Sequence, residues 1–144
     1  MANEQFAFIH KNVVPSPDQW QAAVDAAGFD LKLDPELKVF EDEGFMPCKL
    51  FGKDSGVETY YSPIDEVFDD LAEAEELAGD RDFCISFRWG SRYSEAACAM
   101  VLSYALAEGF GAAVSYEYQE PYGDLAALRK ETEEILKEAA MELA

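Results

Sequence analysis

The reactive side chains of this sequence are mainly carboxylates, because other reactive types are scarce. Nine carboxylates and one arginine fall within residues 63–82, PIDEVFDDLAEAEELAGDRD. Acid/base catalysis needs two carboxyl groups in different environments within a cleft, and acids spread along a solvated helix do not provide that. We therefore expect these acids to attract a basic partner, or only to keep the protein in solution.

Nucleophilic and metal chemistry have few candidates. The one histidine, His10, has no placed carboxylate or nucleophile nearby in the sequence. The three cysteines, Cys48, Cys84 and Cys98, lack a C-x-x-C spacing, and we expect them to pack in the core. The acids of DPELKVFEDEG lack the spacing and the glycine of a calcium loop. The sequence favours a protein that is not an enzyme, with no catalytic residues, metal or cofactor.

Two short segments combine aromatic and charged residues. FRWGSRYSE places Arg88, Trp89, Arg92 and Tyr93 between a strand and the start of a helix. Helix N-termini bind anions, and Trp, Tyr and Arg are enriched at interface hot spots. These four residues are therefore a possible anion-binding or interface cluster, although the arginines could instead pair with nearby carboxylates.

The second segment, YEYQEPYG, mixes tyrosines with acids near the end of a strand. Tyrosine supplies contact area at little entropic cost and acids steer a basic partner, although an ordinary outer strand would look the same. Together with the acids of residues 63–82, it completes our set of predicted partner-binding residues. The set is Asp65, Glu66, Asp69, Asp70, Glu73, Glu76, Tyr116, Glu117, Tyr118 and Tyr122.

The composition indicates a folded protein with a strongly acidic surface. Its 144 residues are the length of one domain, 1–144, and 49% hydrophobic residues are enough for a core. The net charge of −19 disfavours direct binding of nucleic acid or anionic membranes, because phosphate binding needs Lys and Arg. No signal-peptide pattern and no long apolar run is visible, so we expect a cytoplasmic protein.

The first half of the chain reads as strand, helix and sheet. We expect a strand at 6–9 and a helix that Ser16 caps, with Pro17 at its first position and Gly28 at its end. Strands are expected near 37–41, 48–51 and 57–61, with GKDSG as a hairpin loop. Residues 63–79 predict one amphipathic helix with Leu71 on its core face and acids on the other.

The second half contains the clearest unit. Residues 83–89 alternate as a half-buried strand, 94–108 form a helix without internal charge, and 112–118 alternate again, with Tyr116 and Tyr118 on one side. We expect a βαβ-like unit around residues 82–118 and a last helix capped by Asp124. The predicted fold is a single α+β domain with a mixed, mostly antiparallel sheet and helices packed on it. The chain would be a monomer, or a homodimer if a second copy covers the Ala-rich helix.

The chain resembles the small acidic α+β immunity proteins that bacteria encode beside polymorphic or contact-dependent toxins. The resemblance rests on GFMPCKLFGKDSGVETYY, FCISFRWGSRYSEAACAMVLSYALAEG and AAVSYEY in that order, about half of the chain. It implies a non-enzymatic protein that covers a toxin's active site or substrate groove. It transfers no binding residues, because none of these motifs fixes them.

The sequence therefore favours an acidic binding protein that neutralises a basic protein, with a toxin as the partner that the resemblance implies. Two alternatives stay open. One is a nucleic-acid mimic that inhibits a DNA-binding enzyme, with carboxylates in the place of phosphates. The other is a small-molecule-binding or catalytic α+β domain, which would need a deep pocket containing His10 or the cluster from Arg88 to Arg92.

Overall fold

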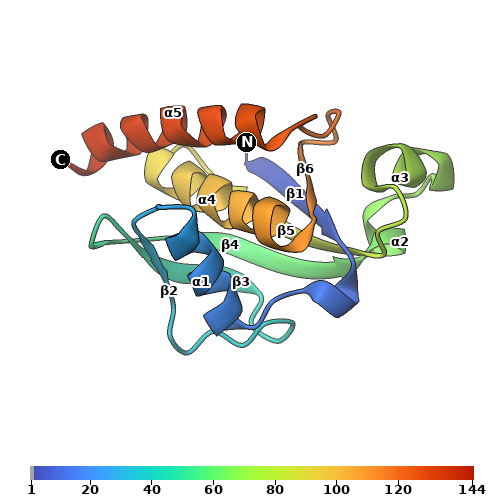
Figure 1. Cartoon of the computed structure of the whole chain (residues 1–144), viewed down its shortest axis with the longest axis horizontal. Coiled ribbons are helices and arrows are strands. Elements are labelled where there is room, and N and C mark those ends of the chain that lie inside the picture. Colours follow the sequence, from blue (N-terminus) through green and yellow to red (C-terminus); the bar gives the residue numbers. More distant parts are fainter. Residues whose placement is uncertain (1) are drawn as a thin grey trace.

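The computed structural model describes residues 2–144, which form a six-stranded sheet with most helices on one face (Figure 1). The strand order is β2-β3-β4-β5-β1-β6, and every neighbouring pair is antiparallel. The predicted α+β class is confirmed. In chain order the elements are β1 (Asn3–Ile9), η1 (Lys11–Val13), α1 (Pro17–Ala26), β2 (Leu31–Leu33), β3 (Gly44–Leu50), β4 (Lys53–Pro63), α2 (Ile64–Val67), α3 (Leu71–Ala78), β5 (Phe83–Trp89), α4 (Tyr93–Phe110), β6 (Ala113–Tyr116) and α5 (Leu125–Leu143).

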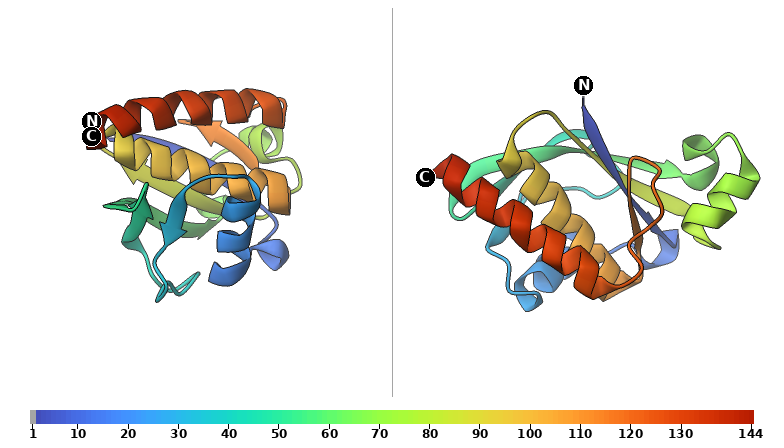
Figure 2. Two further views of the ribbon diagram at one scale, coloured as in Figure 1. Left: turned by 60° about the vertical axis from the view of Figure 1, so that its left-hand side comes forward. Right: turned by 90° about the horizontal axis from the view of Figure 1, so that it is seen from above.

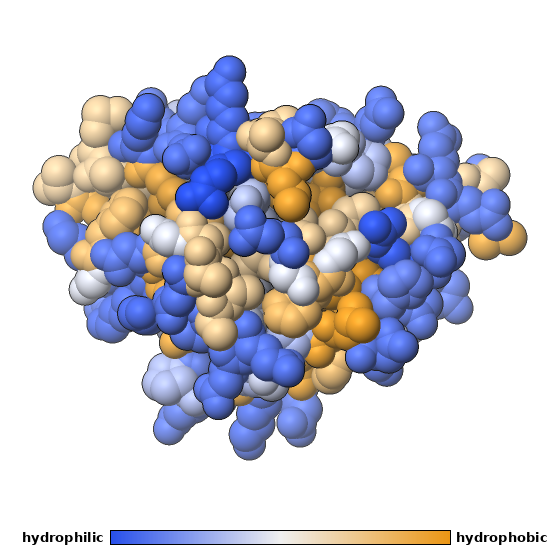
Figure 3. Space-filling model, viewed as in Figure 1, coloured by the Kyte–Doolittle hydropathy of each residue, from blue (hydrophilic) through white to orange (hydrophobic). Residues whose placement is uncertain are grey.

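Helices α1 and α4 cover one face of the sheet, which we call the inner face, and α5 packs on α4 from outside (Figure 2). Helix α4 lies between the sheet and α5, and its residues from Ser94 to Leu106 are buried except for the half-buried Glu95. Hydrophilic residues make up most of the outline of this side, and apolar ones gather toward its middle (Figure 3). The apolar helix is thus covered by its own chain, which removes the reason for expecting a homodimer.

The unit around residues 82–118 is a split βαβ arrangement. Strands β5 and β6 both run antiparallel to β1, which lies between them, so they are parallel to each other. Helix α4 connects them across the inner face. On β5, Phe83, Ile85 and Phe87 point into the core beneath this helix. The predicted βαβ-like unit is confirmed, with β1 inserted between its two strands.

The predicted helix starts are confirmed at both capped positions. The Ser16 hydroxyl accepts from the Gln19 backbone N–H at 3.2 Å, and the Gln19 side chain accepts from the Ser16 N–H at 2.9 Å, which is a capping box. Asp124 accepts from the Ala127 N–H at 2.7 Å and starts α5. Within residues 2–144, no helix has the length and apolar character needed to cross a membrane.

The expected strand at 37–41 is wrong, and so is the GKDSG loop. Residues 35–41 form turns, and the first strand of the hairpin meander is β2 instead. The hairpin turns at Phe51 and Gly52, with φ of 54° and 75°, as a two-residue type I′ turn requires. The turn therefore includes only the first residue of GKDSG, Gly52, and residues 53–56 belong to β4.

The single helix expected at 63–79 is also wrong. Phe68 adopts an extended conformation (φ −118°, ψ 134°), which ends α2 and places its ring 5.5 Å from that of Phe8. Asp70 then caps a second helix, α3, by accepting from the Ala72 N–H at 2.9 Å. The break rotates Leu71 away from the core, and this residue is 75% exposed.

The other face of the sheet, the outer face, is covered only in part. Helices α2 and α3 lie at one end of the molecule and bury a small cluster there (Figure 1). That cluster consists of Phe6, Phe8, Phe68, Ala74, Leu77, Ala78 and Cys84. Farther along the outer face, Phe45 is 59% exposed and Arg88 is exposed as well. The fold thus leaves part of a sheet face open beside the acid-rich helices.

We expect Gly56→Ala to destabilise the protein by about 1–3 kcal/mol, because the site has neither the space nor the backbone conformation for a side chain. An added Cβ would lie 2.5 Å from both the Met46 carbonyl oxygen and the Phe45 ring, and φ is +153°. Urea unfolding measures the change. Gly90→Ala is the matched control, since its Cβ would meet open space, and an equal loss in both variants would contradict the prediction.

Candidate functional site

The open part of the outer face contains a pocket of about 370 Å³, which we call the acidic pocket. Its lining carries three carboxylates and one guanidinium, together with aromatic rings. The lining residues are Glu4, Phe6, Glu43, Tyr60, Ser62, Glu66, Val67, Ser86, Arg88 and Tyr118. They come from β1, β4, β5, α2 and the segments after β6 and before β3, so the sheet register and the α2 turn position the site.

Arg88 lies between two acids of neighbouring strands. It is opposite Glu4 of β1 and Glu58 of β4 in register, and its Nε is 3.9 Å from a Glu4 carboxylate oxygen. The Tyr60 hydroxyl donates to Glu58 at 2.7 Å. The guanidinium therefore pairs with an acid of its own chain, in line with the internal pairing that the sequence left open. The other two lining acids, Glu43 and Glu66, leave the pocket negative.

Tyr118 joins the acidic pocket to helices α2 and α3. Its ring lies 4.7 Å from that of Phe6 and 5.7 Å from that of Phe68. Burial raises the pKa of Tyr118, and the charges of Glu4, Glu73 and Asp69 raise it further. The charges of the predicted acids Asp69 and Glu73 therefore act on this tyrosine.

The structure brings part of the predicted acidic set together. Glu66 lines the acidic pocket with Tyr118, and the charges of Asp69 and Glu73 act on the same tyrosine. The other predicted acids, Asp65, Asp70 and Glu76, are exposed on the same two helices and their connection. Asp70 has a structural task as the cap of α3. The acidic surface therefore continues from the pocket over α2 and α3.

A second pocket, of about 450 Å³, lies on the helix side of the sheet, and we call it the aromatic pocket. It unites five residues that the sequence placed in two separate segments: Trp89, Arg92, Tyr93, Tyr116 and Tyr122. The Trp89 and Tyr116 ring centroids are 6.2 Å apart. The remaining lining residues are Asn3, Gln5, Gly90, Ser91, Ala96, Met100, Glu131 and Ile135.

Each of the two predicted segments is divided between the faces of the sheet. Arg88 and Trp89 are neighbours in a strand, so their side chains point to opposite faces, and the expected cluster of Arg88 with Trp89, Arg92 and Tyr93 does not form. Tyr118 does not share a side with Tyr116. Strand β6 ends at Tyr116, and Glu117 and Tyr118 both have positive φ, 47° and 64°, which turns Tyr118 onto the outer face.

The N-terminus of α4 already holds an anion from the same chain. The carboxylate of Glu142, near the end of α5, accepts from the Tyr93 N–H at 2.9 Å and from the Ser94 N–H at 3.1 Å. These backbone hydrogen bonds lower the pKa of Glu142. An external anion at this helix end would have to displace Glu142, so the predicted anion site is satisfied internally.

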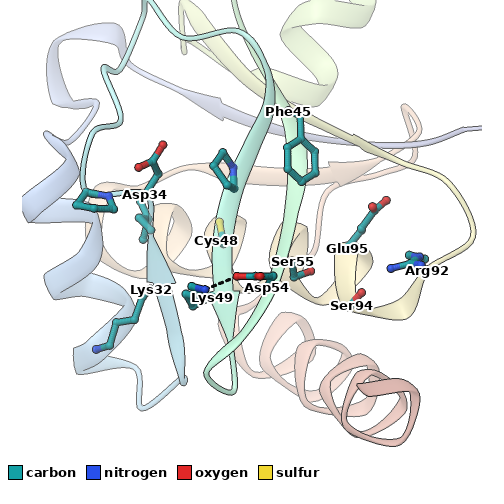
Figure 4. A pocket seen from close by; sticks show the side chains of 13 residues that line it. Lys32, Asp34, Phe45, Cys48, Lys49, Asp54, Ser55, Arg92, Ser94 and Glu95 are labelled. Atoms are coloured by element: carbon teal, nitrogen blue, oxygen red, sulfur yellow. Dashed lines mark hydrogen bonds and ion pairs between the residues drawn. The ribbon is translucent and has the colours of Figure 1, made fainter. Parts of the chain in front are cut away.

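A third pocket, of about 440 Å³, lies beside the β3–β4 hairpin and is shown in Figure 4. Its charged residues have both signs, and Lys49 pairs with Asp54 across the two strands. Arg92 and Glu95 from the start of α4 line its far side. With cations and acids already mixed and partly paired, this pocket favours neither sign of ligand.

The remaining candidates for chemistry are placed as follows. His10 is at the surface, with Nε2 3.4 Å from Asp80. The cysteines are buried thiols, as expected. A hydrogen bond between the Cys48 and Cys98 side chains raises the pKa of Cys48 and lowers the pKa of Cys98. Among residues 2–144, no group of three or more His, Cys, Asp or Glu side chains could hold a metal ion.

Comparisons with known proteins found no match to a family model, to a curated protein or to a solved structure. The geometry of the chain itself therefore carries the functional argument.

Several residues of the two pockets were not predicted from the sequence. Glu4 and Tyr60 could have been found, because strand alternation places them on the outer face with Phe6 and Ser62. Gln5 and Glu131 had no comparable signal, since their place in the aromatic pocket depends on how α4 and α5 pack. Glu142 is a similar case, because its carboxylate reaches a helix that begins 49 residues earlier.

We expect Glu142→Ala to lower the melting temperature at neutral pH, because two N–H groups at the start of α4 lose their acceptor. Because the pKa of Glu142 is lowered in the folded protein, its stabilising effect is fully present at pH values above about 4.3, the ordinary pKa of glutamate. The effect disappears as the pH falls through the lowered pKa of the folded state. Thermal unfolding from pH 7 down to about 3 tests this. Glu138→Ala, which removes an exposed acid from the same helix, should show a much smaller loss at pH 7.

We expect Tyr61→Phe to leave stability at pH 7 unchanged or slightly raised, because the buried Tyr61 hydroxyl has no hydrogen-bond partner within residues 2–144. Burial raises the pKa of Tyr61 to about 12. At pH values below about 10, the ordinary pKa of tyrosine, the wild type therefore keeps its stability. At higher pH its free energy of unfolding falls by up to about 1.4 kcal/mol per pH unit relative to the variant. Urea unfolding at pH 7 and above pH 10 measures both effects. A loss of about 1 kcal/mol or more at pH 7 would show that the hydroxyl is bonded.

Proposed function

We propose that this protein binds a basic surface of another protein through the acidic pocket and the adjoining acids of α2 and α3. The observation that carries the proposal is the pocket itself. It lies on an open sheet face, and its lining has three carboxylates against one guanidinium, which pairs with Glu4 and lies opposite Glu58 in register. A lysine or arginine side chain entering it would meet uncompensated negative charge and aromatic surface.

The surroundings of the pocket favour a protein partner over a small ligand. Glu66 lines the pocket, and Asp69 and Glu73 extend the negative charge beyond it to exposed helices. An extended acidic surface speeds encounter with a basic protein, while Tyr60 and Tyr118 offer contact area at little entropic cost. Phe45, exposed on the same face, adds an apolar contact.

The biological role that we propose is inhibition by coverage. A partner that binds nucleic acid or another anionic substrate has a basic groove, and an acidic protein docked there would block the substrate. A toxin neutralised by its immunity protein is the partner class that the sequence resemblance implies. This role needs neither catalytic residues nor a cofactor from this chain.

The test compares two triple variants that change the net charge equally. One is Glu66→Gln, Asp69→Asn and Glu73→Gln, beside the acidic pocket. The control is Glu133→Gln, Glu134→Gln and Glu138→Gln, all exposed on α5. A basic protein captured from the source cell at low salt is identified and purified, and its dissociation constant is then measured by calorimetry for wild type and both variants.

We expect the variant beside the acidic pocket to bind about tenfold more weakly, as three exposed charge contacts together would give, and the α5 control to bind as the wild type does. The difference should shrink at about 0.5 M salt, where exposed charges are screened. An equal loss in both variants would mean that net charge alone attracts the partner. A wild type that retains no protein at low salt would refute the proposal.

A further inference from the structure

The aromatic pocket contains a buried amide with one polar atom left free. Gln5 is 1% exposed, and its Nε2 donates to the Ser103 hydroxyl at 2.5 Å. That hydroxyl donates its single hydrogen to the Ala99 carbonyl at 2.7 Å, so it can only accept from Gln5. This fixes the orientation of the amide. Within residues 2–144, Oε1 of Gln5 has no partner, which is costly for a buried oxygen unless a donor enters the pocket.

Three other polar side chains of this pocket each donate a hydrogen within the protein. Asn3 donates its Nδ2 to the Gly90 carbonyl at 2.7 Å, and the Tyr116 hydroxyl donates to Asn3 Oδ1 at 2.6 Å. The Tyr122 hydroxyl donates to the Glu131 carboxylate. The two tyrosine hydroxyls have thereby used their single hydrogen and offer a ligand lone pairs, whereas Asn3 Nδ2 keeps a second N–H. The pocket therefore suits a ligand group that is rich in N–H donors.

The walls and the rim favour a positive charge on that group. Trp89, Tyr93, Tyr116 and Tyr122 line the pocket with aromatic rings, whose faces attract cations. The exposed Glu131 adds a carboxylate. Arg92 is the lining cation, and it lies close enough to Glu142 for its charge to help lower the pKa of that carboxyl.

We propose that the aromatic pocket binds a primary ammonium or guanidinium group, with an N–H donated to Gln5 Oε1 and the charge held by aromatic faces and Glu131. Its volume of about 450 Å³ is in the range of small-ligand sites. The pocket lies on the opposite side of the sheet from the acidic pocket, so this site is additional to the proposed protein-binding surface. The group can come from a free amine or guanidine, or from a lysine or arginine side chain.

The experiment titrates the intact protein with n-butylammonium and n-butylguanidinium, followed by NMR of the Gln5 side-chain amide and the Trp89 indole N–H. We expect saturable shifts with a dissociation constant on the order of 1 mM, reasonable for so small a ligand. n-Butyltrimethylammonium, which has the charge but no N–H, should bind at least about tenfold more weakly. A peptide with one arginine flanked by glycines distinguishes the two sources of the group. If the peptide binds, the natural ligand is a protein side chain. If n-butylguanidinium binds and the peptide does not, the natural ligand is a free small molecule.

Variants separate this site from a general attraction of cations to an acidic protein. Gln5→Met removes the free oxygen with little change in size and should weaken binding at least about tenfold. Tyr61→Phe is the matched control, because it removes the other unpartnered buried polar atom of residues 2–144, which lies outside this pocket. Glu131→Gln, at an exposed position, should weaken binding at low salt and tests the site without altering the core.

Two results would overturn the proposal. One is the absence of saturation at concentrations well above about 10 mM, which would mean that water alone serves the Gln5 oxygen. The other is binding that neither Gln5→Met nor Glu131→Gln weakens, which would place the cation elsewhere. Unfolding midpoints of all variants, measured in parallel, show that each one is folded during the titration.

Discussion

The burial of α4 against the inner face of the sheet is the constraint on which the rest of the structure depends. Other elements attach to this helix through side chains that reach it. The Trp20 indole of α1 donates to the Leu102 carbonyl at 3.2 Å, and Gln5 of β1 donates to Ser103. Arg129 of α5 lies over the rings of Phe29 and Tyr104, with 4.8 and 5.4 Å to their centroids. Because α4 must be covered on all sides, α1 and α5 are both drawn to the inner face.

That arrangement decides where a binding surface can form. The core occupies the inner face apart from the aromatic pocket, and the outer face has only the short helices α2 and α3 as a partial cover. Its open strands carry Glu4, Glu58 and Arg88 in one cross-strand row. An apolar partner would bind poorly there, because it would bury these charges. The charge of the chain and the one-sided helix layer thus favour the same conclusion, a polar and mostly negative surface for a basic protein.

Much of the fold could be predicted from the sequence where local signals are strong. The Ser16 capping box, the alternation from Phe83 to Trp89 and the uncharged helix after it are local patterns, and the structure confirms the elements that they predict. The expected half-burial of the strand is wrong, because six of the seven β5 residues are buried. The single helix at 63–79 failed because helical spacing also fits two short helices. What separates them is the contact of Phe68 with Phe8, a residue 60 positions away that the pattern does not contain.

The candidate site was predicted less well, for a related reason. Composition identifies an acidic protein and the tyrosines, but the side of the sheet on which each tyrosine lies depends on two backbone angles after β6. Tyr116 belongs to the aromatic pocket and Tyr118 to the acidic pocket, although one residue separates them. Glu117 joins the two, and its N–H donates to the Glu4 carbonyl at 3.0 Å. A substitution that alters this turn would therefore disturb both pockets at once, so a role for either pocket has to be established with side chains that line it alone, such as Glu66 or Gln5.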